Sequence, residues 1–135
     1  MSGFGLENLY RAIVAVDGAE APERNAPEII MAGLDGSCRV SRMALELFCA
    51  MLGTIAGNVA LTFAARGGVY IAGGIAPRIK DFLARSEFRA RFESKGRFRP
   101  YLQSIPTSVI IHPAASLIGL RSVANRRPDA EAELR

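Results

Sequence analysis

A run of 19 residues without a charged side chain, residues 47–65, constrains the fold of this chain more than any other feature. Its length is close to the roughly 20 apolar residues that a helix needs to span a bilayer. However, Thr54 and Asn58 interrupt the run, and the helical pattern extends back through Glu46 and Arg42. A core helix buried by its own protein explains the same composition. We favour that interpretation over a membrane span.

Helix signals surround this run. Ser2 is a suitable N-cap for an amphipathic helix, Pro27 can open a brief helix that ends toward Gly33, and Ser37 can cap the long helix to about Ala65. Gly53 and Gly57 lie four residues apart within the long helix, a spacing that allows a neighbour to pack closely. The first helix is expected to bury one apolar face, made of Leu6, Leu9, Tyr10, Ile13 and Val14.

Residues 67–75 read GGVYIAGGI, a short apolar strand over residues 69–72 that ends in a pair of glycines. Pro77 is well suited to the first turn of the helix that follows. In α/β sheets, ligands collect at the carboxyl ends of strands, and glycine lets a ligand approach the backbone closely. Taken alone, the pattern also fits a plain structural turn between a strand and a helix.

The second half of the chain continues this alternation. Two short helices are expected after Pro77, the second capped by Ser86, followed by a polar loop over residues 95–100. Residues 108–111 form an apolar run of strand type, and residues 114–123 predict a final helix. We expect that helix to bury Leu117, Ile118 and Leu120. The order predicts an α/β fold with short parallel strands and helical crossovers over residues 1–125, with a polar tail at residues 126–135.

Composition limits the class of protein. A length of 135 residues, half of them hydrophobic, suits one globular domain, and the net charge of +4 identifies no acidic partner by itself. Cys38 and Cys49 would lie roughly 16 Å apart on one helix, which is too far for a disulfide. We expect both to be reduced, buried thiols in a cytoplasmic protein. With one histidine and no CxxC or HxxxH spacing, we expect no metal bound by these residues alone.

Candidate chemical groups are few. His112 follows the second strand, but no carboxylate or nucleophile is placed beside it, so we interpret it as structural. Asp17, Asp35 and Asp81 are isolated acids, and no catalytic residue is predicted. Basic residues between Arg85 and Arg99 alternate with phenylalanines, as in some single-stranded nucleic-acid binders. The helical spacing of these phenylalanines favours a buried apolar face and a solvated basic face instead.

The order of several segments resembles the C-terminal part of the bacterial glucokinases, over roughly residues 2–123. The matching segments are SGFGLENLYRAI, LELFCAMLGTIAGNVALTF, GGVYIAGGIAPR, FRARFESKGRF and IPTSVIIH, in this order. The resemblance implies a mostly helical piece of the large domain of a ribonuclease-H-like fold, as in actin and hexokinase. It also implies ATP as the cofactor, with Mg²⁺ in the complete enzyme, and phosphorylation of glucose.

In that family GGVYIAGGI resembles the adenosine motif. Carried onto this sequence, Gly73 and Gly74 would allow the nucleotide to approach the backbone, and Ile75, Ala76 and Pro77 become candidate neighbours in the wall. The family's N-terminal phosphate loop, its Asn-Asp pair with the catalytic aspartate, its second phosphate loop and its Glu-Gly-Gly-His sugar segment have no counterpart here.

A chain without those motifs should be inactive alone and should need the missing N-terminal part of a glucokinase as its partner. Two parallel strands also make a thin sheet with open edges, so we expect self-association as a symmetric homodimer. The alternative function is a non-catalytic binding or assembly module.

Overall fold

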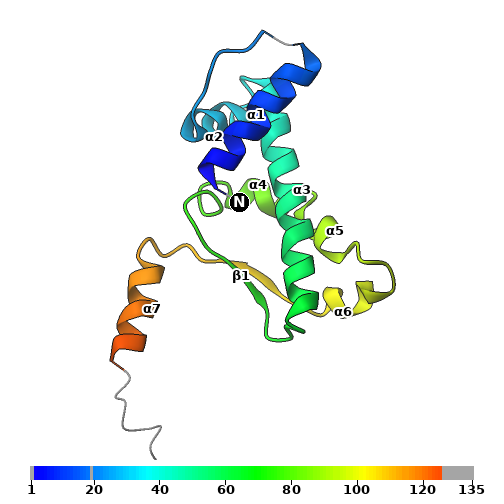
Figure 1. The fold of residues 1–135 in the computed structure, drawn as a ribbon, viewed down its shortest axis with the longest axis vertical. Helices are drawn as coiled ribbons and strands as arrows, with labels where there is room; N and C mark the ends of the chain where they lie inside the picture. The colour runs from blue at the N-terminus through cyan, green and yellow to red at the C-terminus, as the bar shows by residue number, and fades with distance from the viewer. Residues whose placement is uncertain (1, 19, 126–135) are drawn as a thin grey trace, which may run out of the picture.

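The molecule is built around one long helix. The computed structural model describes residues 2–18 and 20–125, and α3 (Arg39–Thr62) runs through the middle of them. α1 (Gly3–Asp17) and α2 (Ala26–Leu34) pack on its first half, and α5 (Phe88–Glu93) packs on its second half (Figure 1). The remaining elements are β1 (Val69–Ile71), α4 (Lys80–Arg85), the 3₁₀ helix η1 (Gly96–Phe98), α6 (Arg99–Gln103), β2 (Thr107–Val109) and α7 (Ala115–Ala124).

Local capping explains where the first helices begin. The Ser2 hydroxyl accepts a hydrogen bond of 3.3 Å from the Gly5 N–H, which confirms the predicted cap of α1. α2 begins at a reciprocal capping box, in which Asn25 and Glu28 each accept a backbone N–H bond from the other. The prediction for α3 was one residue off. Its N-cap is Cys38, and Ser37 belongs to the preceding turn, where its N–H bonds the Asp35 carboxylate at 2.8 Å.

α3 is a core helix, although by length and composition alone it could cross a membrane. Its buried residues recur along its whole length and face α1, α2 and α5: Ser41, Ala44, Leu45, Phe48, Cys49, Gly53, Ala56, Gly57 and Ala60. The helix ends at Thr62 rather than near Ala65, because Ala64 adopts a left-handed conformation with φ of 48° and turns the chain toward β1.

Two glycines determine how closely α3 and α5 approach. A Cβ atom built on Gly53 would collide with the carbonyl oxygen of Phe88, and one built on Gly57 would collide with that of Phe92. Both phenylalanine side chains are buried, with exposed fractions of 5% and 0%. The expected close packing at these glycines is confirmed, and the backbone of α5 is the surface that they contact.

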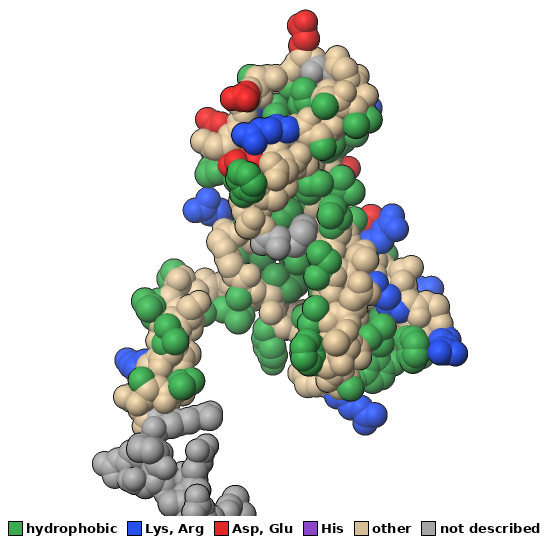
Figure 2. Space-filling view, viewed as in Figure 1, with side chains coloured by type: hydrophobic (Ala, Val, Ile, Leu, Met, Phe, Trp, Pro, Cys, Tyr) green, Lys and Arg blue, Asp and Glu red, His purple; other side chains and the backbone are tan. Residues whose placement is uncertain are grey.

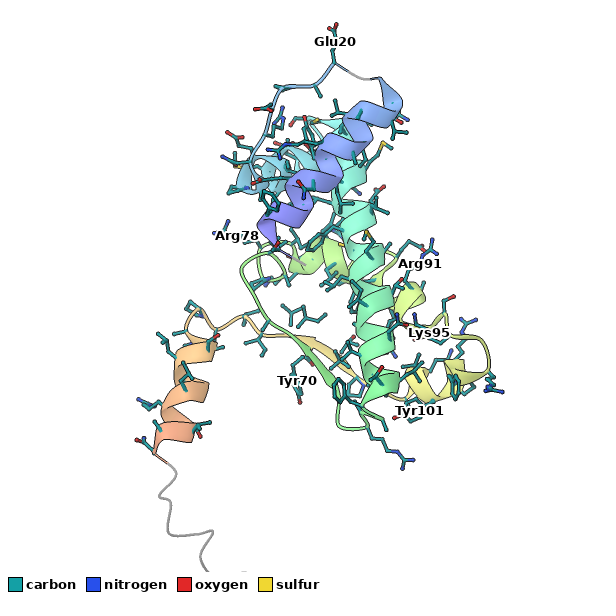
Figure 3. The ribbon with its side chains drawn as sticks, in the orientation of Figure 1. Glu20, Tyr70, Arg78, Arg91, Lys95 and Tyr101 are labelled. Carbon is teal, nitrogen blue, oxygen red and sulfur yellow. The ribbon has the colours of Figure 1, made fainter. Side chains whose placement is uncertain are left out.

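The two strands pair in parallel, as predicted, with Val69 opposite Thr107 and Ile71 opposite Val109. The chain crosses between them through α4, α5, η1 and α6, so the predicted polar loop over residues 95–100 is wrong: its residues form η1 and begin α6. Two side chains attach this crossover to α3 and the turn after it (Figure 3). Lys95 Nζ donates to the Thr54 carbonyl at 3.1 Å, and the Tyr101 hydroxyl donates to the Ala65 carbonyl at 3.2 Å.

α7 forms where the sequence predicts a helix, but it buries none of its residues among the described part of the chain. Leu117, Ile118 and Leu120 are 68%, 46% and 65% exposed, so their predicted burial is wrong. The apolar spacing identifies a face, and α7 stands apart from the helices that could cover that face (Figures 1 and 2). The predicted tail at residues 126–135 lies outside the described residues.

Candidate functional site

The predicted glycine pair follows the carboxyl end of β1. Gly73 has a φ of +126°, a conformation that L side chains rarely adopt, so the backbone itself requires glycine there. Gly74 has no such constraint. A Cβ atom on either residue would meet nothing within 4 Å. The pair therefore presents bare backbone to open space.

On one side of this backbone lies a pocket of about 430 Å³, here called the helix-side pocket. Four of the five predicted residues line it, namely Gly73, Gly74, Ile75 and Ala76. The facing wall comes from the starts of α1 and α2, from α3 and from β1, with Ser2, Gly3, Ala26, Pro27, Ile30, Phe48, Leu52 and Ile71. This pocket is walled mainly by aliphatic and aromatic carbon.

On the other side lies a second pocket of about 440 Å³, here called the strand-end pocket. Gly73 and Gly74 line this pocket too, and Pro77, the fifth predicted residue, is found here rather than in the first one. The opposite wall is the segment that leaves β2, from Ile110 to Pro113, and the start of α7. The pocket thus opens at the carboxyl ends of both parallel strands, where α/β sheets usually bind ligands.

Two details of the predicted wall need correction. Ala76 is only 5% exposed, so it packs beneath the pocket floor more than it offers a contact. Pro77 is not in the first turn of α4, which begins at Lys80. Instead, residues 75–79 form a single turn closed by the Ile79 N–H bonding the Ile75 carbonyl at 3.2 Å.

Sequence reasoning missed Arg78, which follows the predicted residues and lines both pockets. It is the charged side chain common to the two linings, and Figure 3 shows it beside the start of α1. Its position directly after the predicted wall was a usable signal. The α1 and α2 residues of the helix-side pocket lie more than 40 residues earlier in the sequence, and nothing in their local pattern connects them with the glycine pair.

The other candidate groups stay outside catalytic arrangements. His112 lines the strand-end pocket, where its Nδ1 accepts a 3.1 Å hydrogen bond from the Ala114 N–H. Asp17, Asp35 and Asp81 are exposed and line neither pocket. This arrangement gives His112 a backbone-capping role, as predicted from its place at a strand end.

The basic stretch between Arg85 and Arg99 lacks the features of a stacking surface. Phe88 and Phe92 are buried in the core, and Phe98 is half-exposed beneath the Arg97 guanidinium. Arg89 is occupied by the Glu93 carboxylate and three backbone carbonyls. Blue side chains gather over α5 and α6 in Figure 2, and of the three phenylalanines in this stretch only Phe98 is exposed among them.

Comparison with known proteins decides the family. A family model described as Glucokinase matches residues 1–127. The chain belongs to the glucokinase family. Curated glucokinases of Paramagnetospirillum magneticum and Cronobacter sakazakii are 53% and 50% identical to it over 120 and 119 residues.

Each match covers most of this chain, 89% and 88%, but only 37% of the relative, so the chain spans little more than a third of the glucokinases it matches. A crystal structure titled as a glucokinase from an Antarctic psychrotroph superposes with a TM-score of 0.82 at 37% identity, covering 90% of this chain and 38% of that one. These matches confirm the expected fold class, a mostly helical α/β piece of a glucokinase.

Proposed function

We propose that this chain forms the adenosine-side wall of an ATP-dependent glucokinase. The observation that carries the proposal is the bare backbone of Gly73 and Gly74, which lines two pockets beyond the carboxyl end of β1. Ile75, Ala76 and Pro77 complete the wall from the turn that follows. A planar base can lie against peptide groups at van der Waals distance only where no Cβ atom intervenes.

The pocket residues fit a nucleotide. Leu52, Ile71 and Ile75 are half-buried and offer the apolar surface that a purine ring needs, and each pocket is large enough for a base. Arg78 offers a cation at the mouth of both pockets, where it would attract the phosphates of ATP. Adenosine contacts hold and orient the nucleotide. They carry out no bond-making step.

The rest of the reaction needs groups from elsewhere in a glucokinase. Among the described residues no three histidine, cysteine, aspartate or glutamate side chains come together to hold a metal ion. Phosphoryl transfer needs a group that positions the attacking hydroxyl and cations that clamp the phosphates. We therefore expect the isolated chain to form no glucose 6-phosphate from ATP and glucose, and to bind ATP weakly at best.

Complementation tests the proposal. The partner is the Paramagnetospirillum glucokinase truncated to remove the 120 residues that match this chain. We expect that mixing or co-expressing the two pieces restores ATP-dependent glucose 6-phosphate formation, measured by a coupled dehydrogenase assay. Neither piece alone should show activity.

A matched pair of variants then tests the wall. Gly74→Val places a branched side chain where the base would lie, whereas Gly67→Val changes a glycine that also has open space around it and no left-handed φ. In the complemented enzyme, Gly74→Val should raise the Michaelis constant for ATP and leave that for glucose unchanged. Gly67→Val should change neither. If the two variants behave alike, Gly74 does not contact the nucleotide.

A further inference from the structure

Cys38 occupies an unusual place at the beginning of α3. It is the N-cap of a 24-residue helix, the position where serine, threonine, aspartate or asparagine normally accepts a hydrogen bond from the first turn. The Cys38 side chain makes no such bond. A neutral thiol is a weak acceptor, so the N–H groups of the first turn lack the anionic or hydroxyl partner that they favour.

A buried hydroxyl next to it is also left without a partner. Ser41, one turn into α3, is 0% exposed, and its Oγ has no hydrogen-bond partner among the described residues. Cys38 lies three residues earlier, at the N-cap of the same helix, and the Ser41 hydroxyl acts on its sulfur. Buried hydroxyls without partners are uncommon because desolvation makes them costly. A thiolate at Cys38 would provide the missing acceptor.

The loop between α1 and α2 contributes a positively charged side chain, Arg24, to the surroundings of the same sulfur. Arg24 interacts electrostatically with Cys38, and its buried Nε has no hydrogen-bond partner among the described residues. Tyr10 on α1 is a further titratable neighbour of Cys38, and its hydroxyl donates to the Pro22 carbonyl at 2.9 Å. Asp35 interacts electrostatically with Arg24. Cys38 is partly exposed, which corrects the expected burial, so a reagent in solution can reach it.

The balance of these influences favours the thiolate. Burial raises the pKa of the Cys38 thiol, but the Ser41 hydroxyl, the N–H groups of Ser41 and Val40, and the Arg24 charge lower it by more. The pKa of Cys38 therefore lies below its ordinary value. Helix N-termini and neighbouring cations activate cysteines in this way.

We propose that Cys38 is a modification site, a nucleophilic thiol that undergoes exchange with small soluble disulfides such as glutathione disulfide. The Cys38 thiolate attacks one sulfur of the disulfide, a new bond forms between Cys38 and one glutathione, and the bond between the two glutathiones breaks. The second glutathione leaves as a thiolate and takes up the proton that Cys38 released. Cys38 is oxidised and the leaving glutathione is reduced, so electrons and protons balance.

The location gives this modification a structural consequence. Cys38 lies where α3 meets the end of α2, since its N–H donates to the Ala32 carbonyl at 3.2 Å. The start of α2 lines the helix-side pocket through Ala26, Pro27 and Ile30. An adduct on Cys38 therefore lies at the opposite end of the helix that walls this pocket. The modification itself does not depend on the function proposed above.

The second cysteine is the internal control. Cys49 is 0% exposed, and burial raises the pKa of its thiol to about 11. The full chain is incubated with glutathione disulfide at pH 7 and digested, and its peptides are mapped by mass spectrometry. We expect one glutathionyl group on Cys38 and none on Cys49. Equal labelling of both, or of neither, would overturn the proposal.

Alkylation by iodoacetamide measures the activation directly, using the pH dependence of the rate at each cysteine. We expect Cys38 to react at pH 7 about a hundredfold faster than Cys49 or more, with an inflection below that of a free cysteine measured in the same way. Ser41→Ala should move that inflection upward and slow the reaction at pH 7. Ser37→Ala, which removes an exposed hydroxyl next to Cys38, should do neither. An inflection at or above that of free cysteine, or equal effects of the two serine variants, would refute the assignment.

Discussion

Arg89 Nη1 donates a hydrogen bond of 2.9 Å to the carbonyl oxygen of Ile105, the residue that leads into β2. The same guanidinium donates to the carbonyls of Leu102 and Gln103 at 3.2 and 3.0 Å, and its Nε pairs with the Glu93 carboxylate at 2.6 Å. The end of α6 is therefore held to α5 by one side chain. The backbone that positions β2, and with it the strand-end pocket, depends on this contact.

We expect Arg89→Ala to lower the free energy of unfolding by about 1–3 kcal/mol, because hydrogen bonds from a charged donor to three carbonyls are lost. Among the described residues, only the Leu102 carbonyl keeps other donors, which include the Ile105 N–H at 3.1 Å. Arg91→Ala is the control on the same helix, since Arg91 makes only a 4.0 Å exposed pair with Glu87. Such a pair contributes about 0–1 kcal/mol. Urea denaturation measures both, and equal losses would contradict the structural role of Arg89.

The close approach of α3 and α5 gives a second prediction. Gly53→Ala should lower the free energy of unfolding by about 1–3 kcal/mol, because its Cβ meets the Phe88 carbonyl, a backbone atom that cannot move aside freely. Gly119→Ala makes the same change in the exposed helix α7, where a Cβ meets nothing within 4 Å. That variant should be neutral or stabilising, because alanine favours a helix. Thermal unfolding monitored by circular dichroism compares the two.

The raised pKa of the buried Cys49 thiol predicts a loss of stability at alkaline pH. Burial raises the pKa of its thiol to about 11 in the folded chain, whereas an unfolded cysteine titrates near 8.5. Between these values the unfolded chain has released a proton that the folded chain keeps, so stability falls as the pH rises through this window. Near pH 10.5 the loss from this group should be about 2–3 kcal/mol.

Cys49→Ala removes the fall in stability with pH that this thiol causes. Its free energy of unfolding should be lower than that of the wild type at pH 7, because a buried side chain is shortened, and the difference should shrink as the pH approaches 10.5. Tyr10, whose pKa burial also raises, is present in both proteins, so its effect cancels. Urea titrations at several pH values measure the difference. A constant difference would contradict the prediction.

Exposed apolar side chains predict self-association of the isolated chain. Leu47, Met51, Ile55 and Val59 recur every fourth residue on α3, and each is 40–46% exposed. A stripe of this kind favours contact with a second copy. We expect a symmetric dimer by light scattering, and a monomer when Met51 and Ile55 are both replaced by glutamate. Glutamate at Leu117 and Leu120 on α7 is the control. A monomeric wild-type chain with a cooperative thermal transition would show that the described residues are self-sufficient.

The elements that were predicted correctly are those with local signals. The strand at Val69 is indicated by β-branched residues, and the turn after it by adjacent glycines, of which Gly73 has a positive φ. The cap of α1 at Ser2 is equally local. The cap of α3 was misplaced because Ser37 is the better capping residue by type, while the helix begins one residue later, after Cys38.

The features that could not be predicted depend on distant partners. The apolar residues of α7 indicated a face, but burial needs a second surface, which the described residues do not offer it. Ser2, Pro27 and Gly74 line the same helix-side pocket. No local sequence pattern predicts contacts between residues so far apart in the chain. The sequence therefore predicted only the wall of this pocket that follows β1, and not the facing wall from α1, α2 and α3.

The two glycines of α3 also fix a register. Gly53 faces the carbonyl of Phe88, and Gly57 faces that of Phe92, so a step of four residues along α3 matches a step of four along α5 in the same direction. Sliding α5 by one turn, about 5.4 Å, would place one carbonyl over Leu61 or over Cys49, where a side chain blocks it. Of the neighbouring alignments only one places both carbonyls on glycine, so the two glycines fix the position along α3 at which the middle of the crossover to β2 packs.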